Sequence, residues 1–321
     1  MKTMLVTGGT GSFGKSLIKS YLQDKSQLNK IRKIIVYSRD EKKQQDMKLE
    51  FGNLPIQYII GDIRDKHRLC KVFKEVDFIF HAAALKQVPV GEEFPEEVIL
   101  TNVLGTQNII EAAEKCGVEK VVNLSSDKAV MPVNAYGMTK GLSEKLVAAH
   151  EGDTICVSLR YGNVIGSRGS VIPLFISQLK EGKPVTMTDP NMTRFLLTLN
   201  EAVFLSKRCI EEGEQGDLFV IKSPACTVGT LAKAISMGIK KAYSEDIIGI
   251  RPGEKIHETL LTSEEVFKGE EKMAVDGIIY VKVSTKKKSG DYSLSLPFTS
   301  ENTTRFNQQE TLALLKRTGA L

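Results

Sequence analysis

The chain has 321 residues, of which 41% are hydrophobic and 26% charged, a balance typical of a folded globular protein rather than a disordered one. Its formal net charge is +5 and acidic residues are mixed among the basic ones, which argues against nucleic acid as a partner. The apolar runs are too short to span a bilayer and the five cysteines form no CxxC pair, so we expect a cytoplasmic protein with reduced thiols, no membrane contact and no metal site.

The first half of the chain alternates short, β-rich apolar runs with longer helical patterns. The two clearest helical stretches are residues 96–116 and 136–150. The expected strands are residues 4–7, 33–37, 56–60, 78–81, 120–124 and 155–159. This alternation is typical of a parallel sheet wound by crossover helices, so we predict an α/β fold with a doubly wound, Rossmann-type parallel sheet.

The first strand leads directly into a glycine-rich loop, residues 7–14 (TGGTGSFG), that opens a helix. In this context Gly8 permits the tight turn, Gly11 lets the backbone approach a pyrophosphate, and Gly14 lets helix and sheet pack closely. The helix N-terminus offers free N–H groups and a partial positive charge to the phosphates. We therefore predict that a dinucleotide is bound by Gly8, Thr10, Gly11, Ser12, Phe13 and Gly14.

The end of the second strand, residues 37–43 (YSRDEKK), predicts which dinucleotide is bound. An acidic residue that accepts from the ribose 2′-OH favours NAD, whereas a guanidinium at this place pairs with the 2′-phosphate of NADP. Ser38 and Arg39 come first and Lys42 follows, so we predict NADP. Asp40 either caps the next helix or faces the ribose.

Small and polar residues follow the third and fourth strands, in the segments 61–63 (GDI) and 81–86 (HAAALK). Small side chains allow the backbone to run close to a cofactor. We predict that Asp62, Ile63, Ala82 and Ala83 lie at its adenine and nicotinamide edges. Lys86 is expected to reach a phosphate, a ribose or the substrate, unless it is an ordinary exposed lysine.

Tyr136 and Lys140 are four residues apart at the start of a predicted helix, so they lie on one face of it. A tyrosine with a pKa of about 10 is a poor base at neutral pH, but a neighbouring ammonium can lower this pKa by about three. The tyrosinate can then take a hydroxyl proton while hydride leaves the same carbon for a nicotinamide. We therefore predict that both residues are catalytic and also contact the cofactor.

After about residue 163 the pattern loosens, and clusters of Gly, Pro and polar residues separate shorter elements. We assign residues 1–162 to an NADP-binding Rossmann domain. Residues 163–321 are assigned mainly to a smaller C-terminal substrate-binding lobe that can interleave with the first domain. Ligands of open parallel sheets bind beyond the carboxyl ends of the strands, so this lobe is expected to close over that edge.

The glycine loop, Ser126, Tyr136 and Lys140 together resemble the extended short-chain dehydrogenase/reductase family. Within it, the chain is similar to the UDP-N-acetylglucosamine 4,6-dehydratases of polysaccharide and flagellin-sugar biosynthesis that invert the configuration at C5. The similarity runs from Met4 to about Leu261. It rests on the blocks 125–130 (SSDKAV), 134–140 (NAYGMTK), 160–164 (RYGNV), 166–171 (GSRGSV), 192–195 (MTRF) and 251–255 (RPGEK).

The resemblance implies a role for the adjacent Asp127 and Lys128, and it places Ser126 in the catalytic set. Oxidising a sugar at C4 makes its C5 proton acidic, because the new ketone stabilises the carbanion as an enolate. Removing that proton needs a base and expelling the C6 hydroxyl needs an acid. By resemblance, Lys128 is the base and Asp127 protonates the leaving water, after which hydride returns to C6. Lys128 must then be neutral and Asp127 protonated, and a mutual ion pair would oppose both requirements.

The resemblance also implies a substrate, UDP-N-acetylglucosamine or a related UDP-sugar. Arginines suit the two phosphates because their planar donors are permanently charged. The implied substrate-binding residues are Lys86, Asn163, Arg168, Val171, Met192, Arg194, Arg251 and Glu254. Among these, Arg194 and Arg251 are assigned to the phosphates and Glu254 to a ribose hydroxyl. Relatives form homo-oligomers, and we expect the same of this chain.

Several alternatives stay open. A nucleotide-sugar 4-epimerase uses the same tyrosine, lysine and transient ketone but needs no acid–base pair for elimination, and a retaining 4,6-dehydratase differs only in C5 stereochemistry. A non-catalytic NADP-binding scaffold would not need Tyr136 or Lys140. Residues 299–305 (TSENTTR) resemble a capsule-synthesis branch that has methionine where this chain has Tyr136. Residues 269–290 are expected to form an exposed ribbon or flap.

Overall fold

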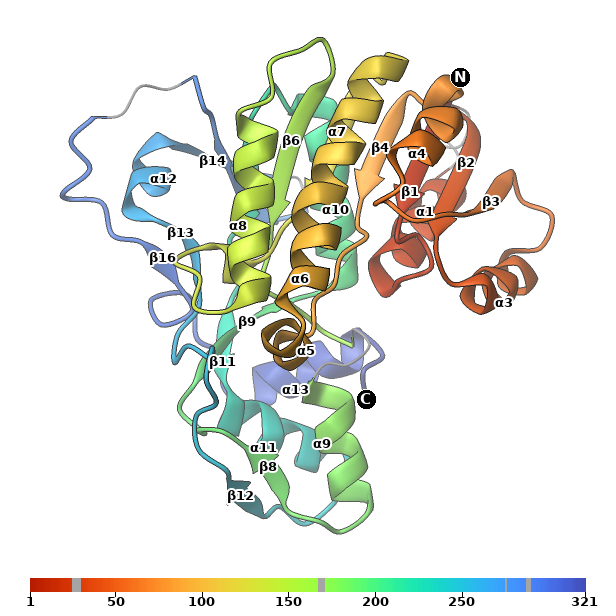
Figure 1. Cartoon of the computed structure of the whole chain (residues 1–321). Coiled ribbons are helices and arrows are strands. Elements are labelled where there is room, and N and C mark those ends of the chain that lie inside the picture. The colour runs from red at the N-terminus through yellow and green to blue at the C-terminus, as the bar shows by residue number, and fades with distance from the viewer. Residues whose placement is uncertain (25–29, 167–170, 275, 287–289) are drawn as a thin grey trace.

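A nine-stranded sheet forms the larger lobe of the protein (Figure 1), in the order β14-β15-β10-β6-β5-β4-β1-β2-β3. The structure is a computed structural model that describes residues 1–24, 30–166, 171–274, 276–286 and 290–321. The seven strands from β10 to β3 are parallel, namely β1 (Lys2–Thr7), β2 (Ile31–Ser38), β3 (Ile56–Ile60), β4 (Phe78–His81), β5 (Lys120–Leu124), β6 (Ile155–Arg160) and β10 (Leu218–Ile221). The predicted fold class is confirmed, and each of the six predicted strands forms within two residues of its expected bounds.

Helices cover both faces of the sheet because side chains of successive strand residues point to opposite faces. Met4 packs with α1 (Ser12–Gln23) and α10 (Leu199–Glu212) on one side, whereas Leu5 packs with α4 (Lys66–Val72) and α7 (Gly105–Cys116) on the other. The remaining helices of this lobe include α3 (Glu41–Phe51), α5 (Val88–Glu93), α6 (Pro95–Val98) and α8 (Ala135–Ala148). The helix predicted over 96–116 forms as most of α6, a π-helical stretch η2 (Ile99–Leu104) and α7.

The smaller lobe has its own core and lies below the sheet in Figure 1. It contains α9 (Val171–Lys180), β8 (Val185–Met187), α11 (Val228–Ile239), β12 (Glu245–Ile247) and α13 (Gln308–Arg317). Two further small sheets form outside the large one. The first consists of β11 (Ala225–Thr227), β9 (Thr193–Leu197) and β7 (Asn163–Val164), and the second of β13 (Thr259–Leu261) and β16 (Phe298–Thr299), which packs against β10 and β15. No helix among the described residues is both long and apolar enough to cross a membrane.

The chain beyond residue 162 contributes to both lobes. Strands β10, β14 (Gly269–Met273) and β15 (Ile279–Val283) complete the large sheet. The expectation of an exposed ribbon over 269–290 is wrong for β15, which pairs antiparallel with β10 and buries Tyr280 against Phe219. The apolar alternation of β15 requires such a partner, since one face of the strand would otherwise leave its side chains in water.

Arg160, at the end of β6, joins four elements near the boundary between the lobes. Its guanidinium donates to both carboxylate oxygens of Glu144 on α8, at 2.6 and 3.0 Å, and to both oxygens of Glu265 on α12 (Ser263–Lys268), at 2.9 and 3.0 Å. It also donates to the carbonyl oxygen of Leu260 on β13 at 2.7 Å. The side chain is buried, so the two carboxylates offset the desolvation of the guanidinium.

Replacing Arg160 by alanine should lower the free energy of unfolding by about 3–5 kcal/mol, because it leaves two carboxylates without their cation in a mostly buried site. The measurement is urea-induced unfolding followed by circular dichroism. Arg32→Ala is the control, since Arg32 pairs with Glu75 at the surface and should contribute less than about 1 kcal/mol. Equal losses in the two variants would contradict the assigned role of Arg160.

Candidate active site

A cavity of about 1030 Å³ lies where the carboxyl ends of the parallel strands face the smaller lobe. Strand register brings these ends level, because Thr7 pairs with His81 and His81 with Asn123. His81 is locked there by hydrogen bonds to the hydroxyls of Thr7, at 2.8 Å, and Thr106, at 3.1 Å. The cavity is therefore built on the rigid edge of the sheet, with the smaller lobe supplying the opposite wall.

Almost every residue predicted for the site lines this cavity. The residues predicted to bind the cofactor that line the cavity are Gly8, Thr10, Gly11, Ser12, Phe13, Gly14, Ser38, Arg39, Asp62, Ile63, Ala82, Ala83, Lys86, Tyr136 and Lys140. The remaining lining residues from the predictions are Ser126, Asp127, Lys128, Asn163, Val171, Met192, Arg194, Arg251 and Glu254. Arg168 lies outside the described residues.

Lys42 is the exception, because it does not line the cavity. It lies in the first turn of α3, where its side chain is 79% exposed and forms an ion pair with Asp46. The helical turn directs Lys42 outward and places Lys43 at the cavity instead. A run of two lysines in sequence did not reveal which of them faces inward.

The glycine loop packs closely against the neighbouring backbone. Gly8 has a φ of +62°, and a Cβ there would approach the Cα of Ala83 to 2.9 Å. A Cβ on Gly14 would lie 2.5 Å from the Cα of Gly9. Gly11 is the N-cap of α1 and has no capping side chain, so the first N–H groups of the helix face the cavity region. The loop thus has no room for a side chain at Gly8 or Gly14.

Asp40 caps the helix that follows β2, and it also lines the cavity. Its carboxylate accepts from the backbone N–H of Lys43 at 2.9 Å and pairs with the Lys43 ammonium at 2.7 Å, so Asp40 caps α3. Arg39 is about half exposed at the cavity, 3.6 Å from the carboxylate of Asp62. Because Arg39 lines the cavity and is about half exposed, its guanidinium is accessible to an anion bound there.

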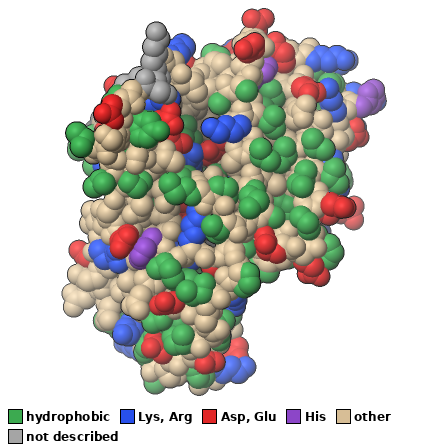
Figure 2. All heavy atoms as spheres, turned by 60° about the vertical axis from the view of Figure 1, so that its left-hand side comes forward, with side chains coloured by type: hydrophobic (Ala, Val, Ile, Leu, Met, Phe, Trp, Pro, Cys, Tyr) green, Lys and Arg blue, Asp and Glu red, His purple; other side chains and the backbone are tan. Residues whose placement is uncertain are grey.

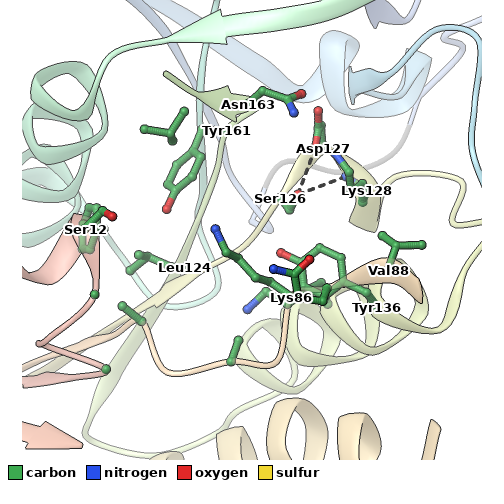
Figure 3. Close-up of a pocket in the computed structure, with 18 of the residues that line it drawn as sticks. Ser12, Lys86, Val88, Leu124, Ser126, Asp127, Lys128, Tyr136, Tyr161 and Asn163 are labelled. Atoms are coloured by element: carbon green, nitrogen blue, oxygen red, sulfur yellow. Dashed lines mark hydrogen bonds and ion pairs between the residues drawn. The ribbon is translucent and has the colours of Figure 1, made fainter. Parts of the chain in front are cut away.

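The catalytic candidates converge from two elements (Figure 3). Asp127 and Lys128 form the short 3-10 helix η3 (Asp127–Ala129), capped by Ser126. One oxygen of Asp127 accepts from the Ser126 hydroxyl at 2.9 Å and from the Lys128 ammonium at 3.1 Å. Tyr136 starts α8, which packs on η3 because Gly137 has no side chain: a Cβ there would overlap the carbonyl oxygen of Lys128. This contact brings Tyr136 beside the Asp127–Lys128 pair.

The prediction that Lys140 lowers the pKa of Tyr136 is wrong for the protein alone. Burial raises the pKa of Tyr136, and it outweighs the lowering effects of the Lys128 charge and of a hydrogen bond with Ser126. Burial also lowers the pKa of Lys140 to about 8, although Glu144 opposes this shift. The two side chains share a helix face, but desolvation exceeds the attraction between opposite charges.

Lys128 is surrounded by more negative charge than its sequence neighbours suggest. Its ammonium lies 3.1 Å from Asp127 and 3.6 Å from Glu258, a residue that was absent from the predicted site. Although burial lowers the pKa of Lys128, the carboxylates of Asp127 and Glu258 together raise it above its ordinary value. The protein alone therefore favours the ammonium, which is the opposite of what a base requires.

The cavity wall near the smaller lobe is rich in cations. Lys86, Arg194 and Arg251 line it together with Lys128, and Arg194 is oriented by its donation to the carbonyl oxygen of Thr193 at 2.8 Å. Burial and the Lys128 charge lower the pKa of Lys86. Such a wall suits an anionic ligand. Within the described ranges, no group of three or more His, Cys, Asp and Glu side chains could hold a metal ion.

Sequence reasoning missed part of the lining. The unpredicted lining residues include Tyr161, Leu174, Thr186, Met187, Thr188 and Ile248. Tyr161 directly follows β6, so the rule that ligands bind beyond strand ends could have found it. The others reach the cavity only through the packing of the smaller lobe, which no local spacing reveals.

Comparison with known proteins places the chain in a family. Residues 4–279 match a family model described as polysaccharide biosynthesis protein. The chain belongs to this family. The protein named UDP-glucose 4-epimerase from Rickettsia rickettsii (strain Sheila Smith) is 45% identical over 328 aligned residues, covering 98% of this chain and 95% of that protein. The chain is thus an enzyme of the nucleotide-sugar epimerase/dehydratase family.

Solved structures agree with this family membership. The X-ray structure of Pen from Bacillus thuringiensis has a TM-score of 0.89 and 35% identity, covering 100% of this chain and 98% of that one. DesIV from Streptomyces venezuelae, a dTDP-glucose 4,6-dehydratase solved with NAD and TYD bound, has a TM-score of 0.71 and 21% identity, covering 79% and 86%. The likeness to DesIV shows a common fold alone.

Replacing Gly137 by alanine should force η3 and α8 apart, because the new Cβ would overlap the backbone carbonyl oxygen of Lys128. The expected loss in the free energy of unfolding is about 1–3 kcal/mol, typical of overpacking. Urea-induced unfolding measures it. The control is Gly91→Ala on α5, where the added Cβ would meet Val98 at an ordinary 3.4 Å. If Gly137→Ala is as stable as the control, the close approach does not constrain this site.

Proposed function

We propose that the protein is an NADP-dependent UDP-N-acetylglucosamine 4,6-dehydratase that inverts the configuration at C5. The observation that carries the proposal is the Asp127–Lys128 pair at the cavity, beside Tyr136 (Figure 3). Oxidation and reduction alone need Tyr136 and Lys140 but no second acid–base pair. Elimination of water across C5 and C6 needs both an acid and a base, which this pair supplies.

The proposed reaction assigns one proton movement to each residue. A nicotinamide dinucleotide held by the glycine loop and by Lys140 would supply the hydride acceptor for C4 and the hydride donor for C6. Tyr136 takes the proton of the C4 hydroxyl, while Lys140 shares its helix face. Lys128 takes the C5 proton, and Asp127 protonates the C6 hydroxyl so that it leaves as water. A proton then reaches C5 from the opposite face, which inverts the centre.

The ion pair is compatible with these roles because the pair shares one proton. Transfer of that proton from the Lys128 ammonium to Asp127, across their hydrogen bond of 3.1 Å, converts the ion pair into an amine and a carboxylic acid. The two forms carry the same number of protons. The reactive form therefore needs no exchange with solvent.

A UDP-sugar is the substrate that the cavity wall favours. Arg194 and Arg251 are assigned to the diphosphate, because guanidinium groups bind phosphate oxygens through paired donors. Glu254 lies at the same wall and is assigned to the ribose, and Asn163, Val171 and Met192 to the sugar and uracil. The name of the rickettsial relative also contains a UDP-sugar, which supports this class.

NADP is the proposed cofactor because Arg39 lines the cavity while the carboxylate of Asp40 is engaged with Lys43. DesIV was solved with NAD, so the two dinucleotides must be compared directly. Arg39→Ala should weaken NADP binding by about 10- to 100-fold, as expected for a lost bond between charged groups, and leave NAD binding unchanged. Calorimetric titration of cofactor-depleted protein measures both.

The matched control for Arg39 is Lys42→Ala. Lys42 is close in sequence but faces solvent, so its removal should leave the affinity for NADP unchanged. Equal NADP affinity in wild type and Arg39→Ala would contradict the assignment of the 2′-phosphate to Arg39.

A 4-epimerase is the second candidate, favoured by the name of the 45% identical rickettsial relative. It would use Tyr136 and Lys140 with the same transient ketone. The raised pKa of Lys128 fits this candidate as well, because an epimerase does not require a neutral Lys128. Water loss is the property that separates the two reactions.

The enzyme is incubated with UDP-N-acetylglucosamine in D₂O with no added cofactor, and the sugar is monitored by NMR. The expected product is a 4-keto-6-deoxy sugar with deuterium at C5 and inverted C5 stereochemistry. The hydride cycles within each turnover, so cofactor that remains bound suffices. Retained stereochemistry would contradict inversion while leaving dehydration. Formation of the C4 epimer without loss of water would favour the epimerase.

Lys128→Ala is the companion variant for this assay. It should slow water loss by at least about 100-fold, the range of general acid–base catalysis, while NADP stays bound. Full turnover by this variant would remove Lys128 from the mechanism.

A homo-oligomer and a cytoplasmic location remain predictions. Exposed apolar side chains occur on η2 and α8, two elements that pack on each other, and they include Ile99, Leu104, Met138 and Leu142. Such side chains support a subunit interface. On the face in Figure 2, acidic and basic side chains are interspersed with apolar ones.

A further inference from the structure

The Asp127–Lys128 pair has a third member, Glu258. One oxygen of Glu258 lies 3.6 Å from the Lys128 ammonium, and the Glu258 side chain is 4% exposed. Asp127 and Lys128 are among the described residues that line the cavity, whereas Glu258 is not. Glu258 therefore contacts Lys128 from the protein interior, out of reach of a ligand in the cavity.

The backbone of Glu258 is held on both sides. Its N–H donates to the hydroxyl of Ser300 at 2.9 Å, and its carbonyl oxygen accepts from the Ser300 N–H at 2.8 Å. Ser300 is fully buried and donates in turn to the carbonyl oxygen of Thr193 at 3.2 Å. Arg160 fixes the carbonyl of Leu260, two residues further along the chain. The backbone that carries this carboxylate is thus held by the fold, independently of Lys128.

Both carboxylates that contact Lys128 keep one buried oxygen without a hydrogen-bond partner among the described residues. These atoms are Oδ2 of Asp127 and Oε2 of Glu258. Burying such an oxygen is unfavourable unless a charge or a ligand compensates it. Lys255 lies 3.9 Å from Oε2 of Glu258 and provides a second positive charge there. Asp127, in contrast, borders the cavity, where a ligand hydroxyl can supply the missing contact.

Charge balance shows what Glu258 contributes. In the proposed elimination Lys128 becomes an ammonium as it takes the C5 proton, and an ammonium without negative charge nearby is strongly unfavourable in a buried site. The carboxylate of Glu258 pairs with this newly formed ammonium whether or not Asp127 has yet given its proton to the C6 hydroxyl. The charges of Glu258 and Lys255 also balance each other, so the group of four side chains is neutral when all are ionised.

We propose that Glu258 is a positioning residue that holds Lys128 beside Asp127 and stabilises the ammonium that forms when Lys128 takes the C5 proton. The inference rests on the proposed function for its consequence in catalysis. The contact between Glu258 and Lys128 can be tested without any substrate.

The charged and titratable groups around Lys128 come from several elements. They are Asp127 on η3, Glu258 before β13, Arg194 on β9, Tyr136 on α8, Lys86 after β4 and Lys255 near Glu258. The carboxylates stabilise the ammonium and the three other cations destabilise it. Removing the charge of Glu258 alone must therefore shift Lys128 toward the neutral amine.

The test is the rate at which trace acetic anhydride acetylates Lys128 at pH 9, quantified by mass spectrometry of the peptide that carries it. Only the neutral amine reacts, and loss of a carboxylate within about 4–6 Å lowers the pKa of a cation by at least about one. Glu258→Gln should therefore raise the rate about tenfold or more. Glu301→Gln, which alters an exposed carboxylate that pairs with His257, is the matched control and should leave the rate unchanged. An unchanged rate in Glu258→Gln overturns the proposal.

Glu258→Asp provides a second variant if Glu258→Gln does not fold. This variant keeps the negative charge but moves the carboxylate away from Lys128 by one methylene. The acetylation rate of Lys128 should therefore change little. Water loss should slow by about 100-fold, as expected when a group near the reacting atoms is displaced by roughly 1 Å. Hydride transfer, followed by absorbance of the reduced nicotinamide, should persist. Loss of both steps together would indicate a purely structural role and overturn the positioning role.

Wild type is assayed in parallel to separate the two levels of inference. If wild type loses no water, the proposed dehydratase function fails, and the acetylation rates still decide whether Glu258 holds Lys128. If wild type loses water and Glu258→Asp matches it, only the role of Glu258 fails.

Discussion

The parallel direction of seven strands is the constraint on which the site depends. Parallel strands place all their carboxyl ends at one edge, and this edge receives the glycine loop, the alanine segment, η3 and the start of α8. Residues far apart in the chain thus meet at this one edge. The smaller lobe needs only to supply the opposite wall, which it does with Arg194, Arg251 and the β8 segment.

Burial of charge is the second organising feature. Arg160 and Lys128 lie in the same part of the molecule, and each is held by two carboxylates. The two groups differ in what surrounds them: Arg160 is enclosed by protein, whereas Lys128 borders the cavity. The first arrangement is suited to holding elements together, and the second leaves a charged group where a ligand can reach it. The two groups are connected by a short segment of chain: Glu258 contacts Lys128, and the carbonyl oxygen of Leu260 on β13, two residues later, accepts from Arg160.

Much of the fold and site followed from local patterns. The strands and the glycine loop are encoded by contiguous residues, and Tyr136 and Lys140 by helical spacing, so each could be predicted in place. Glu258 could not, because it meets Lys128 only after β13 pairs with β16, across 130 residues of chain. The prediction for the pKa of Tyr136 was wrong for a related reason. Spacing predicts which charged groups are near the phenol, but the extent of burial decides whether desolvation or these charges have the larger effect. Choosing Lys43 over Lys42 as the residue at the cavity would have required knowing where α3 begins, which two adjacent lysines do not reveal.

The order of strands in the sheet has a consequence for how the chain acquires its structure. β6 is complete at Arg160, yet its neighbour β10 begins only at Leu218, and β15 at Ile279. Lys120, the first residue of the central strand β5, likewise finds its carbonyl partners only at Ile210 and Gly213. During synthesis, the first half of the protein therefore carries an unpaired, apolar sheet edge until these later residues leave the ribosome. The nascent chain is most exposed to aggregation in that interval, which is where assistance by a chaperone would matter most.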